Sequence, residues 1–290
     1  MKNKKLIFFY IFWGALSTLF FTYWLFPSAL LEQVMTSSIR NYSKDLKVQF
    51  KDIKPALPPG LKLSDVNVSY FDVPVFNAEY IKLMPGISSL MSDTKRLTID
   101  AVSCGGDWDT AIKFNDMAQN PTLFIKTDIK HVHLEELPVK DLFMGYAVKG
   151  KLDLKGTCDI AGQIIKTGEI NIFLKDMEVA IKNRLIGIDT LSFDSIEIEA
   201  DILDNRVEVK RGDVSGKQAS GVITGAIDIK VPFELSRLAL IGNVKPQPDF
   251  LKNITKRLPI GGFLNKMNLK NGIPFTINGT VSDPDFSMDR

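Results

Sequence analysis

Ile196-Glu-Ile-Glu-Ala-Asp-Ile202 alternates an apolar residue with an acidic residue at every position. Successive side chains of a β-strand point to opposite faces of its sheet. As a strand, this stretch would therefore place all its apolar side chains on one face and all its carboxylates on the other. A helix would scatter both kinds around its axis, so the stretch predicts a strand with one apolar and one polar face.

The same alternation recurs along most of the chain. It is found at residues 61–68, 97–101, 152–154, 170–174, 223–231 and 275–281. Sustained alternation is typical of antiparallel strands that pack one face and expose the other to water. We therefore predict a mainly β fold, with a curved antiparallel sheet. A few short helices are expected at 85–91, 135–145 and 249–258.

Two six-residue segments resemble each other. Gly150-Lys-Leu-Asp-Leu-Lys155 and Gly225-Ala-Ile-Asp-Ile-Lys230 are identical at three of six positions and exchange Leu for Ile at two more. A glycine that opens a strand often marks a bulge or a bend, which would let a long sheet curl. The pair suggests repeated β units, and hence two repeated halves.

The N-terminal segment is apolar and uncharged from Leu6 to Phe26. At a rise of about 1.5 Å per residue, a helix of this length covers roughly 30 Å, the thickness of a bilayer's hydrocarbon core. We therefore expect a transmembrane helix over residues 6–26. Its expected interfacial aromatic residues are Tyr10, Trp13, Tyr23 and Trp24. Its positive flank consists of Lys2, Lys4 and Lys5, which would keep the N-terminus in the cytoplasm.

A cleaved signal peptide is the alternative for this segment. Signal peptides have a shorter apolar region, of roughly 7–15 residues, and end at a small-x-small cleavage site. The run here is longer, and Pro27-Ser-Ala-Leu-Leu31 is a poor cleavage site. Retention as an anchor is therefore favoured.

The expected organisation has four parts. Residues 1–5 form a cytoplasmic tail, 6–26 the transmembrane helix, 27–59 an amphipathic linker and 60–290 a β-rich domain outside the cytoplasm. In the linker, apolar residues recur at helical spacing from Leu30 to Ile39, which predicts a short amphipathic helix.

Composition argues against a nucleic-acid partner. The chain has 36 basic and 34 acidic residues, and removing the three lysines of the N-terminal flank leaves 36 − 3 = 33 basic residues. A nearly neutral domain lacks the clustered positive charge with which proteins neutralise phosphates.

The chain contains two cysteines, Cys104 and Cys158, both in the domain expected outside the cytoplasm. In an oxidising compartment they could form a disulfide. They could equally be buried thiols, because spacing along the sequence does not show whether their Cα atoms approach closely enough.

Motifs for catalysis are weak. His131 and His133, the two histidines, lack the further ligands that a metal site needs. The stretch from Gly212 to Gln218 is one residue short of a phosphate-binding loop and lacks its Ser or Thr. We therefore expect no catalytic residues, no metal and no cofactor, and a protein that is not an enzyme.

Two acid-x-acid pairs, Asp107-Trp-Asp109 and Asp283-Pro-Asp285, offer an enzymatic alternative. Membrane-anchored glycosyltransferases use such pairs to bind a metal-nucleotide. They also need strands that alternate with long helices, and the sequence does not predict such helices. The glycosyltransferase interpretation is therefore the weaker one.

Several short motifs occur in an order that resembles a known family. They are the Arg40-to-Asp45 linker, Leu83-Met-Pro-Gly-Ile-Ser-Ser-Leu90, Cys104-Gly-Gly106, Lys149-Gly-Lys-Leu-Asp-Leu-Lys-Gly156, Ser236-Arg-Leu-Ala-Leu240, Pro274-Phe-Thr-Ile-Asn-Gly-Thr280 and Asp283-Pro-Asp-Phe286. Together they resemble the bacterial type II secretion system protein N (GspN) family, in the form found with AsmA-like domains. The resemblance spans nearly the whole chain, and its specificity lies in the order of the motifs.

This resemblance implies a non-enzymatic component of a type II secretion system. The chain would be a single-pass protein of the bacterial inner membrane, with an AsmA-like β-sheet in the periplasm and other secretion subunits as partners. AsmA-like relatives suggest an alternative, in which an open apolar groove binds or transfers lipid acyl chains. The alternating strands are also compatible with a closed sandwich or barrel core, so the sequence leaves open groove and closed core as equal possibilities.

Overall fold

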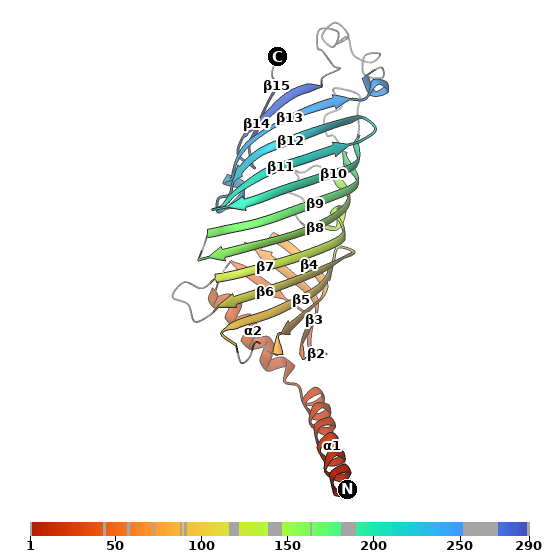
Figure 1. Cartoon of the computed structure of the whole chain (residues 1–290), viewed down its shortest axis with the longest axis vertical. Coiled ribbons are helices and arrows are strands. Elements are labelled where there is room, and N and C mark those ends of the chain that lie inside the picture. The colour runs from red at the N-terminus through yellow and green to blue at the C-terminus, as the bar shows by residue number, and fades with distance from the viewer. Residues whose placement is uncertain are drawn as a thin grey trace.

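The computed structural model shows one large antiparallel sheet (Figure 1). The structure describes residues 2–42, 45–56, 59–71, 73–87, 89, 92–115, 122–138, 147–162, 164–180, 190–251 and 272–288. Within these ranges the sheet has 15 strands, and the mainly β antiparallel fold expected from the alternation is confirmed. The alternating strand in which the sequence pattern is clearest becomes β10 (Thr190–Leu203).

The remaining elements follow one another along the chain as hairpins. The strands are β1 (Leu46–Gln49), β2 (Asp52–Ala56), β3 (Gly60–Tyr70), β4 (Val73–Pro85), β5 (Thr94–Ser103), β6 (Gly106–Asn115), β7 (Thr122–His133), β8 (Val148–Ala161), β9 (Ile164–Ala180), β11 (Arg206–Ser215), β12 (Ala219–Asp228), β13 (Arg237–Pro246), β14 (Ile273–Gly279) and β15 (Pro284–Met288). The helices are α1 (Lys2–Trp24), α2 (Ser28–Tyr42) and the 3₁₀ turns η2 (Leu134–Glu136) and η5 (Phe233–Leu235).

From β3 to β15, each strand pairs with the next one in sequence. β1 and β2 both pair with β3, at its two ends. The strands stack along the long axis of the molecule and form a long, twisted and curved wall, with α1 projecting from one end and β15 at the other (Figure 1). Such a chain of neighbouring pairs is built almost entirely from hairpin connections, which join antiparallel strands with short loops.

Two glycines accompany irregularities that bend the sheet. Gly150 has φ 140° and lies at a bulge in β8 between Lys149 and Lys151. Gly225 has φ 133° and pairs with Val209, next to a register shift in β11. These register shifts confirm the expectation that the glycines of the two similar segments mark bulges. A bulge increases the local twist of the strands.

The first strands begin earlier than expected. β1 and β2 lie within residues 27–59, which the sequence assigned to a linker. Pro55 lies in β2, which is an edge strand of the sheet, and edge strands tolerate proline because one side of the strand needs no hydrogen-bond donors. The sheet therefore begins before residue 60, the boundary expected from the sequence.

The amphipathic helix predicted after residue 27 is confirmed as α2. Leu31 and Met35 pack against a buried cluster in the first strands of the sheet, together with Phe26. The buried members of this cluster are Ile53, Leu63, Val66 and Ala78. Leu30 and Val34 lie on the other side of α2 and are exposed, so α2 buries only part of its apolar surface.

A helix forms at the expected N-terminal anchor, but the membrane span is not supported. In the part of the chain that the structure describes, we find no helix with the length and apolar character that a bilayer crossing requires. Within α1 the Thr18 hydroxyl donates a hydrogen bond to the Gly14 carbonyl, 2.9 Å away. α1 ends at Trp24, before Pro27.

The expected interfacial aromatic residues of α1, namely Tyr10, Trp13, Tyr23 and Trp24, are all exposed. Nothing is described of the side chains of Lys2, Lys4 and Lys5, so their role as a flank stays a prediction. Of the short helices expected elsewhere, η2 lies at the edge of residues 135–145, and a single helical turn occupies residues 248–251. The rest of residues 135–145 and 249–258 lies largely outside the described ranges.

Candidate functional site: the apolar face of the sheet

The register of the strands aligns apolar residues into one continuous row across the sheet. From β2 to β15 the directly paired residues of this row are Ile53, Leu63, Ile81, Ala101, Trp108, Ile129, Leu154, Ile172, Ile198, Gly212, Ile223, Gly242, Phe275 and Met288. Every member is apolar or glycine. Parallel rows lie two residues away along each strand on the same face, which we call the apolar face.

The apolar face is covered unevenly. At one end α2 packs on it over β2 to β4, and a second buried cluster forms around Cys104, Ile129 and Val132. Further along, Ile172, Ile198 and Ile223 are only half-buried. Among the described residues from β9 onward, the buried hydrophobic side chains are those of Ala200, Ile202 and Ala226.

Side-chain packing along the face is lateral, from strand to strand. A Cβ built on Gly242 would lie 2.3 Å from the Phe275 ring, and one built on Gly212 would lie 2.4 Å from the Ile223 side chain. Large side chains therefore lie over the glycines of neighbouring strands. Over β9 to β14 the extensive contacts of each described strand are with its neighbours in the sheet, and Ile172, Ile198 and Ile223 of the apolar row stay half-buried.

The opposite face carries charged side chains in the same register. Asp100, Asp109 and Asp128 are directly paired across β5, β6 and β7. Burial, and then the charge of Asp109, raise the pKa of Asp100. Because the pKa of Asp100 is raised in the folded chain, its ionisation costs stability as the pH rises through its ordinary range, so Asp100 destabilises the fold at neutral pH relative to acidic pH.

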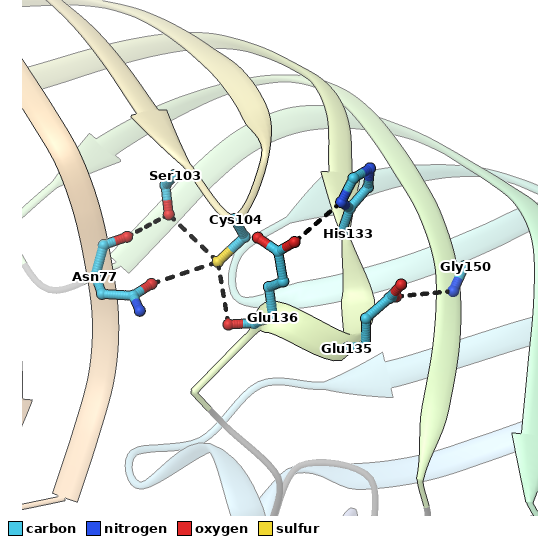
Figure 2. A network of polar contacts seen from close by, with 7 residues as sticks. All are labelled: Asn77, Ser103, Cys104, His133, Glu135, Glu136 and Gly150. Atoms are coloured by element: carbon cyan, nitrogen blue, oxygen red, sulfur yellow. Dashed lines mark hydrogen bonds and ion pairs between the residues drawn. The ribbon is translucent and has the colours of Figure 1, made fainter.

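Cys104 lies at the tight turn between β5 and β6, in a network of polar contacts (Figure 2). Its Sγ lies 3.4 Å from Asn77 Oδ1 and 3.4 Å from the Glu136 carbonyl oxygen. The Ser103 hydroxyl donates to the Asn77 carbonyl. These contacts tie the β5–β6 turn to β4 and to the segment after β7.

Of the two possibilities that the sequence left open for the cysteines, the structure shows the free thiols and not the disulfide. Cys104 lies at the β5–β6 turn. Cys158 lies on the apolar face of β8, where it pairs with Ile125 of β7. It is four residues along β8 from Leu154, which belongs to the apolar row with Ile129 and Trp108. The two thiols therefore lie at different positions along the length of the strands. Burial, followed by the charge of Asp159, raises the pKa of Cys158, which disfavours its reactive thiolate.

The two histidines bind different carboxylates. The His131 backbone N–H donates to Asp153 Oδ1 at 2.7 Å, and His133 Nδ1 lies 3.2 Å from Glu136 Oε1 (Figure 2). His131 has φ 61° and belongs to a bulge in β7, so the two side chains do not lie as a regular pair on one strand face. In the described ranges, no group of three or more His, Cys, Asp or Glu side chains could hold a metal ion.

The structure gives the first acid-x-acid pair a different meaning. Asp107 and Asp109 lie on the polar face of β6, and Trp108 between them belongs to the apolar row. The pair is therefore part of a two-faced strand, with both carboxylates on its polar face. Asp283 lies in the turn before β15 and Asp285 lies in β15, while the stretch from Gly212 to Gln218 joins the end of β11 to the turn before β12.

Sequence reasoning did not single out Trp108, Ile112, Ile125 and Ile129 on the apolar face. Their signal was present, because apolar residues alternate along both β6 and β7. The aspartates on either side of Trp108 were interpreted as an acid-x-acid pair, so the strand pattern around Trp108 was not recognised. Comparisons of the chain with protein-family models, with curated proteins and with solved structures find no match.

Proposed function

We propose that this protein is a non-enzymatic lipid-binding protein of the bacterial cell envelope, and that lipid acyl chains lie along its apolar face. One observation carries the proposal. The apolar row runs without a polar interruption from Ile53 to Met288, and over β9 to β14 its side chains stay half-exposed. Large exposed apolar surfaces on soluble folds mark binding sites for proteins, membranes or apolar ligands.

Acyl chains fit the chemistry of this face. Apolar contact is non-directional, and burial contributes about 0.8 kcal/mol for each methylene group removed from water. Over β9 to β14 the face offers isoleucine, leucine and phenylalanine side chains in rows. Its polar atoms in the described residues include the indole Nε1 of Trp108, which is buried without a hydrogen-bond partner, and the paired hydroxyls of Thr110 and Thr127, which lie toward the α2 end on β6 and β7. A long, flexible, apolar molecule meets these conditions over the length of several strands.

Attachment to the inner membrane through α1 is part of the proposal, and it rests on the uncharged run from Leu6 to Phe26 in the sequence, not on a membrane span found in the structure. Exposed aliphatic and aromatic side chains surround α1 on all sides, which is typical of a helix in contact with lipid. The lysines at its start favour an N-terminus toward the cytoplasm, with the sheet in the periplasm. In that arrangement the apolar face begins close to the membrane from which it would receive lipid.

The proposal is tested by placing charges on the apolar face. The double variant Ile198→Asp/Ile223→Asp should retain at least about tenfold less phospholipid, because a carboxylate there would have to be desolvated against acyl chains. The measurement is mass spectrometry of lipid that co-purifies with the full chain. Circular dichroism shows whether each variant keeps its sheet.

The matched control is Val222→Asp/Ile241→Asp. It makes similar changes at exposed apolar residues on the opposite face, on β12 itself and on β13 beside it, and it should retain lipid as the native chain does. If the Ile198→Asp/Ile223→Asp variant does not fold, Ile198→Thr/Ile223→Thr takes its place. This variant keeps β-branched side chains and should lose lipid to a smaller extent. Equal retention by the two double Asp variants would contradict the proposal.

A role as a component of a type II secretion system is the second candidate. The order of motifs resembles that family, and no described strand pairs with the outer side of β15, where Phe286 and Met288 are 68% and 67% exposed. A free strand edge is a common docking surface. A photo-crosslinking amino acid at Phe286 should capture secretion subunits in cells, whereas one at Thr224 on β12 should not. Capture of lipid alone at both positions would count against this role.

A further inference from the structure

An apolar cleft of about 910 Å³ separates α1 from the hairpin of β2 and β3. From α1 it is lined by the aromatic residues Trp13, Phe20, Phe21 and Tyr23, and from the hairpin mainly by Pro55 and Ala56. This volume is in the range of pockets that hold drug-sized ligands. Its walls are apolar, so its occupant should be apolar as well.

A row of lysines lies beside this cleft on the polar face of the sheet. Lys54, Lys62 and Lys82 are directly paired across β2, β3 and β4. Like charges placed directly opposite each other on neighbouring strands repel and destabilise a sheet. This arrangement therefore calls for negative charge near the row.

The acidic residues nearby offset only part of the row. Lys54 Nζ lies 2.6 Å from Asp52 Oδ2, and Lys82 pairs across the strands with Asp100. The Lys62 ammonium lies 4.4 Å from the centre of the Tyr80 ring, and among the ion pairs of the described residues none involves Lys62. The Lys82 ammonium lies 5.3 Å from the same ring. Two ammonium groups thus gather around Tyr80.

Lys54 connects the row to the cleft. It precedes Pro55, which lines the cleft, and its charge interacts with Tyr23 on the α1 wall. The pKa of Lys54 is raised, first by its hydrogen bond to Asp52 and by the charge of Asp52, and to a smaller extent by Tyr23. A molecule whose apolar part occupies the cleft would therefore place its polar end near these lysines.

We propose that the cleft and the lysine row together bind one anionic phospholipid, with acyl chain in the cleft and phosphate on Lys54, Lys62 and Lys82. This inference rests on the proposed lipid-binding function and deepens it, because it names the charge of the lipid and a first binding site outside the apolar face. The site lies where α1 meets the sheet, so a lipid taken from the bilayer around α1 reaches it before the long apolar face.

The test uses the full chain in vesicles that contain a photoactivatable phosphatidylglycerol or phosphatidylcholine with a diazirine in its acyl chain. Labelled peptides are identified by mass spectrometry. In the native chain, phosphatidylglycerol should label the cleft peptides of α1 and β2 at least about tenfold more than phosphatidylcholine. Each basic residue near a lipid surface contributes roughly fivefold in affinity for anionic lipid.

Two pairs of variants separate headgroup from chain binding. Lys54→Gln/Lys62→Gln/Lys82→Gln should lose the preference for phosphatidylglycerol, whereas the charge-matched control Lys155→Gln/Lys166→Gln/Lys210→Gln should keep it. Ser17→Trp, which fills the cleft, should reduce labelling by both lipids at the cleft. Thr18→Trp changes a neighbouring residue that does not line the cleft, and it should leave the labelling unchanged.

Equal labelling by the two lipids in the native chain would overturn the inference, as would a preference that survives in the lysine variant. Removal of the cleft label by excess inorganic phosphate would also overturn it, since the row would then bind free phosphate. Peptides from β9 to β12 are read in the same samples. Label there but not at the cleft refutes this inference alone, and label at neither place refutes the proposed function too.

Discussion

Replacing Val66 by Asp should destabilise the sheet by at least about 3 kcal/mol. Val66 is 1% exposed and belongs to the cluster under α2 with Ile53, Leu63 and Ala78. A carboxylate at this position would lose its hydration, and the cluster offers apolar contacts in place of water. Urea unfolding of the full chain in detergent, followed by circular dichroism, measures the change.

Val222→Asp is the matched control for this prediction. Val222 is 52% exposed and lies on the polar face of β12, so the same chemical change should alter the free energy of unfolding by no more than about 0.5 kcal/mol. If both variants unfolded at the same urea concentration as the native chain, the cluster under α2 would not be a stabilising core. Hydrogen exchange would show whether the Val66 variant opens the first strands alone, since each strand contacts chiefly its neighbours.

Replacing Gly225 by Val should cost about 2–4 kcal/mol. Gly225 has φ 133°, a conformation that β-branched residues avoid. A Cβ at this position would also lie 2.3 Å from the Ala239 carbonyl oxygen and 2.8 Å from Leu240 Cα. Both atoms belong to the backbone of β13, so the clash is relieved only by moving a strand.

The control for Gly225 is Thr224→Val on the same strand. It introduces the same residue at a position without a positive φ, and its melting temperature should stay close to that of the native chain. A Gly225→Val variant as stable as the Thr224→Val variant would show that the sheet relaxes around this bend. The lost curvature would then be expected to appear as a changed circular-dichroism spectrum.

Much of the fold was readable from local pattern. The alternation at Ile196 to Ile202 predicted the strand that became β10, and the helical spacing after Leu30 predicted α2. The glycines of the two similar segments correctly marked bends. These features succeed because the period of the side chains and the backbone freedom of glycine are properties of a few neighbouring residues.

Other features depended on residues distant in sequence. The early strands β1 and β2 form because β3 offers both of its ends for pairing, and no pattern in the short segment around Pro55 announces this. Whether Cys104 and Cys158 pair was left open by the sequence, and the structure shows both as free thiols at different positions along their strands. The choice between an open and a covered apolar surface was likewise left open, since alternation looks the same in both.

The amino-acid sequence by itself determined that this protein is built from two-faced strands behind an apolar N-terminal helix, because hydrophobic periodicity is local. Only the tertiary structure decided which residues face one another: the apolar row from Ile53 to Met288, the three aligned lysines and the cleft beside α1. Register is set by pairing between strands, and a shift of one residue would exchange the two faces. The surfaces proposed to bind lipid exist only once that register is fixed.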